Sequence, residues 1–112
     1  AQDRGIDATL RVVELFAAER RWLKVAGGPK RNLLEGCIAP GDRLVELGTF
    51  VGYSALLACR QLRRLGGGGS VISCEADVHA AIAARTLLAW AGADEVRVRV
   101  GLAADWLMGC RL

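Results

Sequence analysis

Three short apolar segments alternate with longer amphipathic segments, and this alternation constrains the fold more than any other feature of the sequence. The apolar segments are residues 43–47, 70–75 and 95–100, and residues 53–65 and 77–90 between them have helical periodicity. Strands separated by helices form crossover units, which build parallel sheets. The sequence therefore predicts an α/β protein with a parallel three-strand half-sheet.

The third apolar segment predicts its own place in the sheet. In Glu95–Val100, valines alternate strictly with charged residues, so one face of this strand should be wet, as in an edge strand. The two earlier strands are more apolar and should lie further inside. We therefore predict the strand order 3-2-1, with strand 43–47 central in a longer parent protein.

Two helices are predicted before the first strand. Residues Ile6–Lys24 carry apolar side chains at helical spacing, and a second helix should run from Lys30 to Cys37, before the turn at Pro40-Gly41. Residues 1–40 and the βαβαβ unit 41–112 are expected to form a single partial domain. The chain begins with alanine and ends at Leu112, so we expect both ends to be cuts in a longer polypeptide.

Composition excludes some classes of function. The net charge of +3 comes from arginines that are spread along the chain and not interleaved with aromatics, which argues against nucleic-acid binding and for solvated helix faces. No apolar run approaches the roughly 20 residues of a membrane-spanning helix. The four cysteines form no C-x-x-C pair, and His79 has no cysteine at ligand spacing, so no metal site is predicted. Cys59 and Cys74 should be buried thiols in a cytoplasmic protein.

Glycines follow the first predicted strand, and an acid ends the second one. Gly48 lets the backbone bend and approach a ligand without a Cβ, and Gly52 starts a helix whose amides favour a carboxylate. Glu75 lies at the same rim of the sheet, where it can accept hydrogen bonds from the two hydroxyls of a ribose. The pair predicts a nucleoside-binding site.

The type of nucleoside is narrowed by what the turn lacks. The dinucleotide fingerprint G-x-G-x-x-G is absent, because Phe50 and Val51 occupy the space that a pyrophosphate would need. A nicotinamide-binding half-domain is therefore disfavoured. A nucleoside without a diphosphate is expected, and S-adenosylmethionine fits this description.

The segment Glu46-Leu47-Gly48-Thr49-Phe50-Val51-Gly52-Tyr53-Ser54 resembles the cofactor motif of the catechol O-methyltransferases, a family of class I S-adenosylmethionine-dependent O-methyltransferases. Further similar pieces occur in the family's order at Trp22–Lys30, Cys74–Glu75, Ala91–Val96 and Val100–Leu107. The resemblance implies a Rossmann-like doubly wound methyltransferase fold, truncated to its cofactor-binding half. Caffeoyl-CoA-type O-methyltransferases share a similar turn but more often have aspartate in place of Glu75, which favours the catechol type.

The resemblance also implies which residues contact the cofactor. They are Val25, Glu46, Gly48, Thr49, Phe50, Gly52, Tyr53, Ser54, Glu75, Gly101 and Ala103. The turn and Glu46 would line the methionine end, with Thr49 and Phe50 contributing their backbone and Ser54 holding the carboxylate. Val25 would contact the cofactor from the N-terminal loop, and Gly101 and Ala103 would border the adenine. Phe50 and Tyr53 are equally compatible with simple packing.

No catalytic or metal-binding residue is assigned in this chain. In the family that it resembles, the Mg²⁺ ligands and the catalytic lysine follow a fourth strand, so Mg²⁺ is expected only in the full-length parent. Asp105 is interpreted as a helix-start residue. The expected substrate is a catechol-like small molecule. The alternative is a non-catalytic nucleoside-binding module with the same fold, and the oligomeric state is not predicted.

Overall fold

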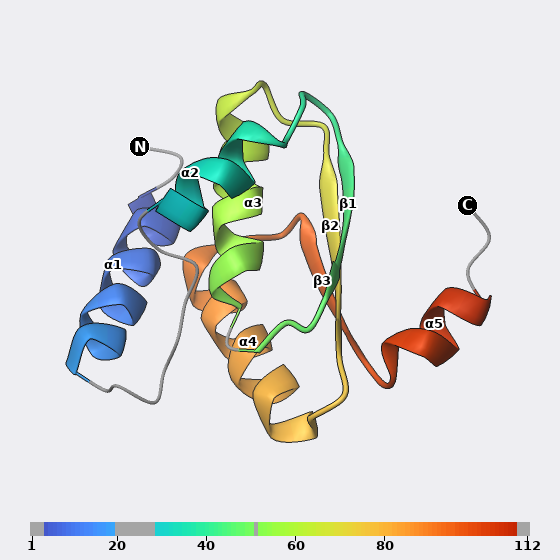
Figure 1. Ribbon diagram of the computed structural model, residues 1–112. Coiled ribbons are helices and arrows are strands. Elements are labelled where there is room, and N and C mark those ends of the chain that lie inside the picture. The colour runs from blue at the N-terminus through green and yellow to red at the C-terminus, as the bar shows by residue number, and fades with distance from the viewer. Residues whose placement is uncertain (1–3, 20–28, 51, 110–112) are drawn as a thin grey trace.

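The structure, a computed structural model, describes residues 4–19, 29–50 and 52–109. Along the chain the elements are α1 (Arg4–Glu19), α2 (Pro29–Gly36), β1 (Arg43–Leu47), α3 (Tyr53–Arg64), β2 (Ser70–Glu75), α4 (Val78–Ala91), β3 (Val96–Val100) and α5 (Ala103–Gly109) (Figure 1). The predicted alternation of strands and helices is confirmed.

The strands form one parallel sheet in the order β1-β2-β3, which confirms the predicted order 3-2-1. Leu47 pairs with Cys74 and Cys74 with Arg99, so the three strands end side by side at one rim. β1 lies at an edge of this sheet, where Val45 and Leu47 are 47% and 55% exposed. The central position expected of β1 concerns a longer parent and stays a prediction.

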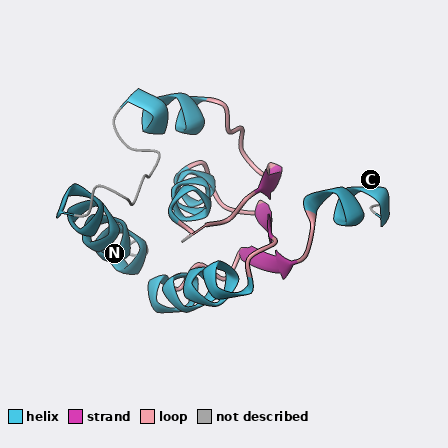
Figure 2. Ribbon diagram, turned by 60° about the horizontal axis from the view of Figure 1, so that its bottom comes forward, coloured by secondary structure: helices cyan, strands magenta, loops and turns pink. Residues whose placement is uncertain are grey.

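The helices form layers on both sides of the sheet (Figure 2). α3 and α4 cover one face, α1 and α2 pack outside α3, and α5 lies on the opposite face beside β2. Because side chains alternate along a strand, Val71, Ser73 and Val98 point into the helix layer and are buried. Arg97 and Arg99 point the other way and are exposed, as the alternation of β3 predicted.

The interpretation of α3 as a helix with a solvated arginine face is wrong for two of its arginines. Arg60 is only 5% exposed, and Arg63 is partly buried against Glu95, whereas Arg64 is exposed. α1 and α2 pack against the side of α3 that faces away from the sheet. The periodicity of α3 alone carries no information about these two helices, so it could not predict the burial of Arg60. α3 is therefore the central helix of the helix layer, surrounded on several sides.

The ends of α4 follow the sequence closely. The Asp77 side chain accepts hydrogen bonds from the backbone N–H groups of His79 and Ala80, and Gly92 ends the helix in the left-handed conformation at φ 70°. Aspartate is a common N-cap, and glycine is common just past the end of a helix. None of the helices in the described part of the chain has the length and apolar character needed to cross a membrane.

Candidate functional site

The carboxyl ends of the strands bring the predicted site residues to one rim. The backbone N–H of Gly48 donates to the carbonyl of Cys74 at 2.8 Å, and that of Gly101 donates to the carbonyl of Glu75 at 2.9 Å. These bonds continue the sheet pairing past the ends of β1 and β3. The expectation that Gly48 and Glu75 lie at the same rim is confirmed.

Glu75 connects two loops at this rim. One carboxylate oxygen accepts the N–H of Phe50 at 2.8 Å, and the other accepts the N–H of Asp77 at 3.0 Å. Glu75 is partly exposed, and each carboxylate oxygen can accept a further hydrogen bond. The carboxylate is thus held in one orientation and keeps acceptor capacity toward solvent.

The turn between β1 and α3 has a left-handed backbone at three described positions. Gly48 has φ +93°, Phe50 has φ 50° and Gly52 has φ 90°. No atom lies within 4 Å of the place where a Cβ on Gly48 would stand. The backbone angle, and not lack of space, therefore requires glycine there, and the space beside it is open. Phe50 is the only non-glycine residue with positive φ in the described segments, a strain that commonly marks functional loops.

A buried hydrogen-bond chain lies beneath the turn. The Ser73 hydroxyl donates to the Glu46 carboxylate at 2.6 Å and lies 2.5 Å from the Thr49 hydroxyl. Ser73 is fully buried and Thr49 is 3% exposed. The Thr49 side chain points inward, so a contact of Thr49 with a ligand at the rim would have to come from its backbone. Sequence reasoning missed Ser73, because a serine in a strand is unremarkable until its register with Glu46 is known.

The pKa of Glu46 is raised above its usual value. Burial is the largest cause, and the negative charge of Glu75 adds to it, while the hydrogen bond from Ser73 acts in the opposite direction. Glu75 is the only charged group acting on the pKa of Glu46 among the described residues. The site thus holds two carboxylates close enough to repel each other, which favours a cationic ligand group near them.

The start of α3 offers backbone amides to the site. Gly52 is the N-cap and has no side chain with which to cap the helix. The N–H groups of the first turn therefore keep hydrogen-bonding capacity, and the helix dipole favours an anion there. Ser54 lies in this turn and is half-buried. This end of α3 suits a carboxylate, and binding of a carboxylate by Ser54 stays a prediction.

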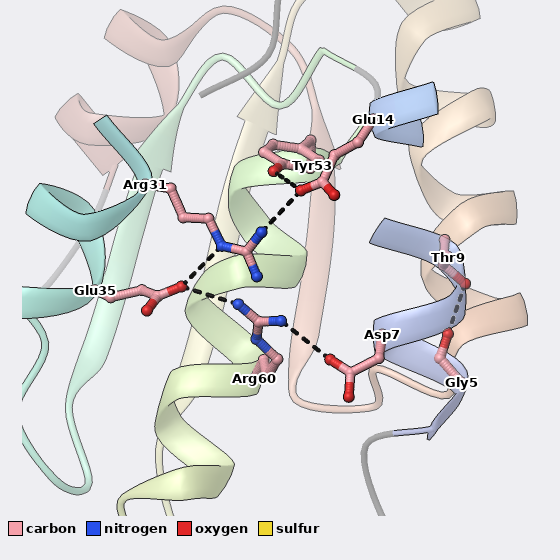
Figure 3. Close-up of polar contacts among 8 residues, drawn as sticks. All are labelled: Gly5, Asp7, Thr9, Glu14, Arg31, Glu35, Tyr53 and Arg60. Carbon is pink, nitrogen blue, oxygen red and sulfur yellow. Dashed lines mark hydrogen bonds and ion pairs between the residues drawn. The ribbon is translucent and has the colours of Figure 1, made fainter. Parts of the chain in front are cut away.

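Tyr53 does not turn its side chain into the site. The residue is 3% exposed, and its hydroxyl donates to the carboxylate of Glu14 on α1 (Figure 3). Burial and then the hydrogen bond to Glu14 raise the pKa of Tyr53 to about 12. For this side chain the packing alternative is therefore the better interpretation, and only the backbone of Tyr53 lies at the helix start.

A network of charged side chains fixes the three helices around Tyr53 (Figure 3). Arg31 of α2 donates to Glu14 at 2.9 Å and to Glu35 at 3.2 Å, and Arg60 of α3 donates to Glu35 at 2.9 Å and to Asp7 at 3.0 Å. Burial would raise the pKa of Glu35, but the hydrogen bonds from its two arginines outweigh burial and lower it. The network ties α1 and α2 to the helix that starts at the rim. The spacing of Arg31 and Glu35 on one helix was its only sequence signal.

The end of β3 borders a hollow. Gly101 has φ 146° and is exposed, and Ala103 begins α5 half-buried. A hollow of about 340 Å³ lies here, lined by Cys74, Arg99, Val100, Gly101, Leu102, Asp105 and Trp106. Asp105 lies in the first turn of α5, which confirms its interpretation as a helix-start residue. The hollow is large enough for a flat heterocycle.

The remaining predictions concern Val25, metal ligands and the buried cysteines. Val25 falls outside the described residues. Within residues 4–19, 29–50 and 52–109, no three His, Cys, Asp or Glu side chains gather in a way that could hold a metal ion. Cys59 and Cys74 are buried, as predicted.

Comparison with known proteins gives relatives of one kind. No protein-family model matches the chain. Catechol O-methyltransferase B of Danio rerio is 30% identical over 103 residues, which cover 89% of this chain and 38% of that protein. An O-methyltransferase from Bacillus cereus, solved with SAH, has 30% identity and a TM-score of 0.71 over 90% of this chain and 46% of its own. The chain resembles one half of a class I O-methyltransferase.

A second solved structure extends this methyltransferase similarity. The O-methyltransferase TomG from Streptomyces achromogenes, involved in tomaymycin synthesis and solved with SAM, has 28% identity and a TM-score of 0.68 over 95% of this chain. The fold is therefore the Rossmann-like methyltransferase fold predicted from the sequence. The chain spans less than half the length of the O-methyltransferases named here.

Proposed function

We propose that this protein binds S-adenosylmethionine at the rim formed by Gly48, Glu75 and Gly101, as the cofactor-binding part of a catechol-type O-methyltransferase. The substrate would be a catechol-like small molecule, methylated on a hydroxyl group. The observation that carries the proposal is the Glu75 carboxylate, held against the turn by the Phe50 amide at 2.8 Å. A carboxylate at the end of a second strand, beside a glycine turn, is suited to the hydroxyls of a ribose.

The described residues fit this cofactor. The space beside Gly48 is open, and Glu75 can accept two further hydrogen bonds from ribose hydroxyls. The amides of the first turn of α3, with Ser54, suit the amino-acid carboxylate. Glu46 and Glu75 supply negative charge for the ammonium group. The hollow beside Gly101 would receive the adenine.

The residues of this chain would bind and orient the cofactor, and the reacting methyl group would come from the cofactor. When bound, S-adenosylmethionine supplies an electrophilic methyl group on a sulfonium sulfur, which an acceptor hydroxyl oxygen takes up with loss of its proton. Holding the amino-acid and ribose portions fixes the direction in which that methyl points. The described residues do not gather into a Mg²⁺ site. If the reaction depends on Mg²⁺, its ligands are proposed to lie outside this chain.

Two observations bear on the alternatives to this function. The absence of a metal-binding cluster among the described residues is compatible with a non-catalytic nucleoside-binding module. A caffeoyl-CoA-type substrate is the second alternative, and Glu75 in place of aspartate favours the catechol type. A cytoplasmic location is proposed with the enzyme and is compatible with the buried Cys59 and Cys74 thiols.

Calorimetric titration with S-adenosylhomocysteine tests the proposal. We expect the wild type to bind and Glu75→Ala to weaken binding by at least tenfold, since a charge-assisted bond contributes about 1.5–3 kcal/mol. Glu19→Ala, an exposed acid at the end of α1, is the matched control and should bind like the wild type. Absence of binding by the wild type, or equal loss in both variants, would overturn the proposal. Methylation of a catechol by the full-length protein then separates an enzyme from a binding module.

A further inference from the structure

Ser73 lies where two parts of the candidate site meet. It pairs with Glu46 across β1 and β2 and precedes Glu75 by two positions on the same face of the sheet. It is fully buried and cannot contact a ligand at the rim itself. Its hydroxyl nevertheless contacts Glu46 at 2.6 Å and Thr49 at 2.5 Å.

The hydroxyl hydrogen atoms of this hydrogen-bond chain can be placed by elimination. While Glu46 is ionised its carboxylate only accepts, so the single hydroxyl hydrogen of Ser73 points to Glu46. Thr49 must then donate its own proton to the Ser73 oxygen. The chain runs from Thr49 through Ser73 to Glu46, and each bond polarises the next. Removing the central hydroxyl would leave a buried Thr49 hydroxyl without its acceptor and Glu46 without its donor.

The two ends of this hydrogen-bond chain, Thr49 and Glu46, belong to different parts of the site. Thr49 lies in the turn between Gly48 and Phe50, whose amide binds Glu75. Glu46 carries the carboxylate at the end of β1. One buried hydroxyl therefore fixes the turn and the carboxylate relative to each other, and α3 packs against this strand from the helix side.

We propose that Ser73 is a positioning residue of the cofactor site, which holds the Thr49 side chain and the Glu46 carboxylate in the arrangement that receives the amino-acid end of S-adenosylmethionine. This inference rests on the proposed function. It adds a residue that touches neither the cofactor nor the solvent and acts through two residues that line the site.

Titration with S-adenosylhomocysteine across pH tests this role. Ser73→Ala should weaken binding about tenfold at neutral pH. It should also move the acidic midpoint of binding to higher pH, because the lost hydrogen bond favoured the charged form of Glu46. Glu75 also acts on Glu46 and is unchanged in this variant. Ser73→Thr keeps the hydroxyl and should restore the wild-type midpoint, and Ser70→Ala, at the other end of β2, is the matched control.

The outcomes are distinguishable. A purely structural role for Ser73 would lower affinity equally at every pH, and an unchanged midpoint in Ser73→Ala would overturn the inference while the proposed function stands. Absence of binding by the wild type would overturn both. If Ser73→Ala does not fold, Thr49→Val removes one bond of the same chain at constant shape, and it should weaken binding. Wild-type affinity in Thr49→Val would then overturn the inference.

Discussion

The backbone amide of Phe50 donates a hydrogen bond to the carboxylate of Glu75 at 2.8 Å, although 25 positions separate the two residues. This bond joins the turn after β1 to the acid that ends β2. It needs both the parallel pairing of the strands and the left-handed backbone of Phe50, at φ 50°. The candidate site is therefore a product of the sheet rim and not of a local motif alone.

Replacing Gly48 by alanine should damage the turn. At φ +93° a Cβ is strained, so we expect Gly48→Ala to lower the free energy of unfolding by about 1–2 kcal/mol and to weaken binding of S-adenosylhomocysteine. Gly36→Ala is the matched control, since its Cβ would also meet no atom within 4 Å but its backbone is helical. Urea unfolding measures the free energy of unfolding of both variants. Equal stability of the two variants would show that the Gly48 conformation is not required.

Arg60 should be among the most sensitive positions in the helix layer. Arg60→Ala removes two ion pairs and the packing of a buried side chain, while Glu35 keeps its ion pair with Arg31 and Asp7 is half-exposed, so we expect a loss of about 1–3 kcal/mol in the free energy of unfolding. Arg64→Ala, exposed on the same helix, should change it by less than about 0.5 kcal/mol. Similar unfolding midpoints in urea for the two variants would contradict the network.

The Tyr53 hydroxyl should matter for stability and not for binding. Tyr53→Phe removes the hydrogen bond to Glu14, and we expect a loss of about 1–2 kcal/mol, because Arg31 still compensates the carboxylate. The affinity for S-adenosylhomocysteine should stay within about twofold of the wild type, which is about 0.4 kcal/mol. A large drop in affinity with unchanged thermal stability would show that the Tyr53 side chain contributes to cofactor binding.

The raised pKa of Glu46 predicts a trade between stability and binding. A group whose pKa is raised on folding contributes stability at low pH that is lost as the pH rises through the folded-state pKa. Glu46→Gln, which cannot ionise, should therefore be more stable than the wild type at neutral pH, and the difference should shrink toward acid. The same variant should bind S-adenosylhomocysteine more weakly. Thermal unfolding across pH checks the first expectation, and a constant difference in stability at all pH values would contradict it.

The sequence predicted the strands, their order and the rim, because apolar alternation and glycine turns are local signals. It did not predict the burial of Arg60, which depends on helices α1 and α2 packing over α3. It could not predict where the Tyr53 side chain points, since its partner Glu14 lies 39 positions away. Ser73 was missed for a similar reason, because only the register of β1 and β2 brings it beside Glu46.

The most direct measurement is the backbone amide NMR spectrum of the protein during titration with S-adenosylhomocysteine. If the turn and the acid hold the ribose and amino-acid portions, the largest shifts should occur at Gly48, Phe50 and Asp77, and Glu75→Ala should reduce them strongly at the same ligand concentration. The exposed amides of α1 should stay unchanged. Saturable binding whose shifts lie away from these amides would contradict the account.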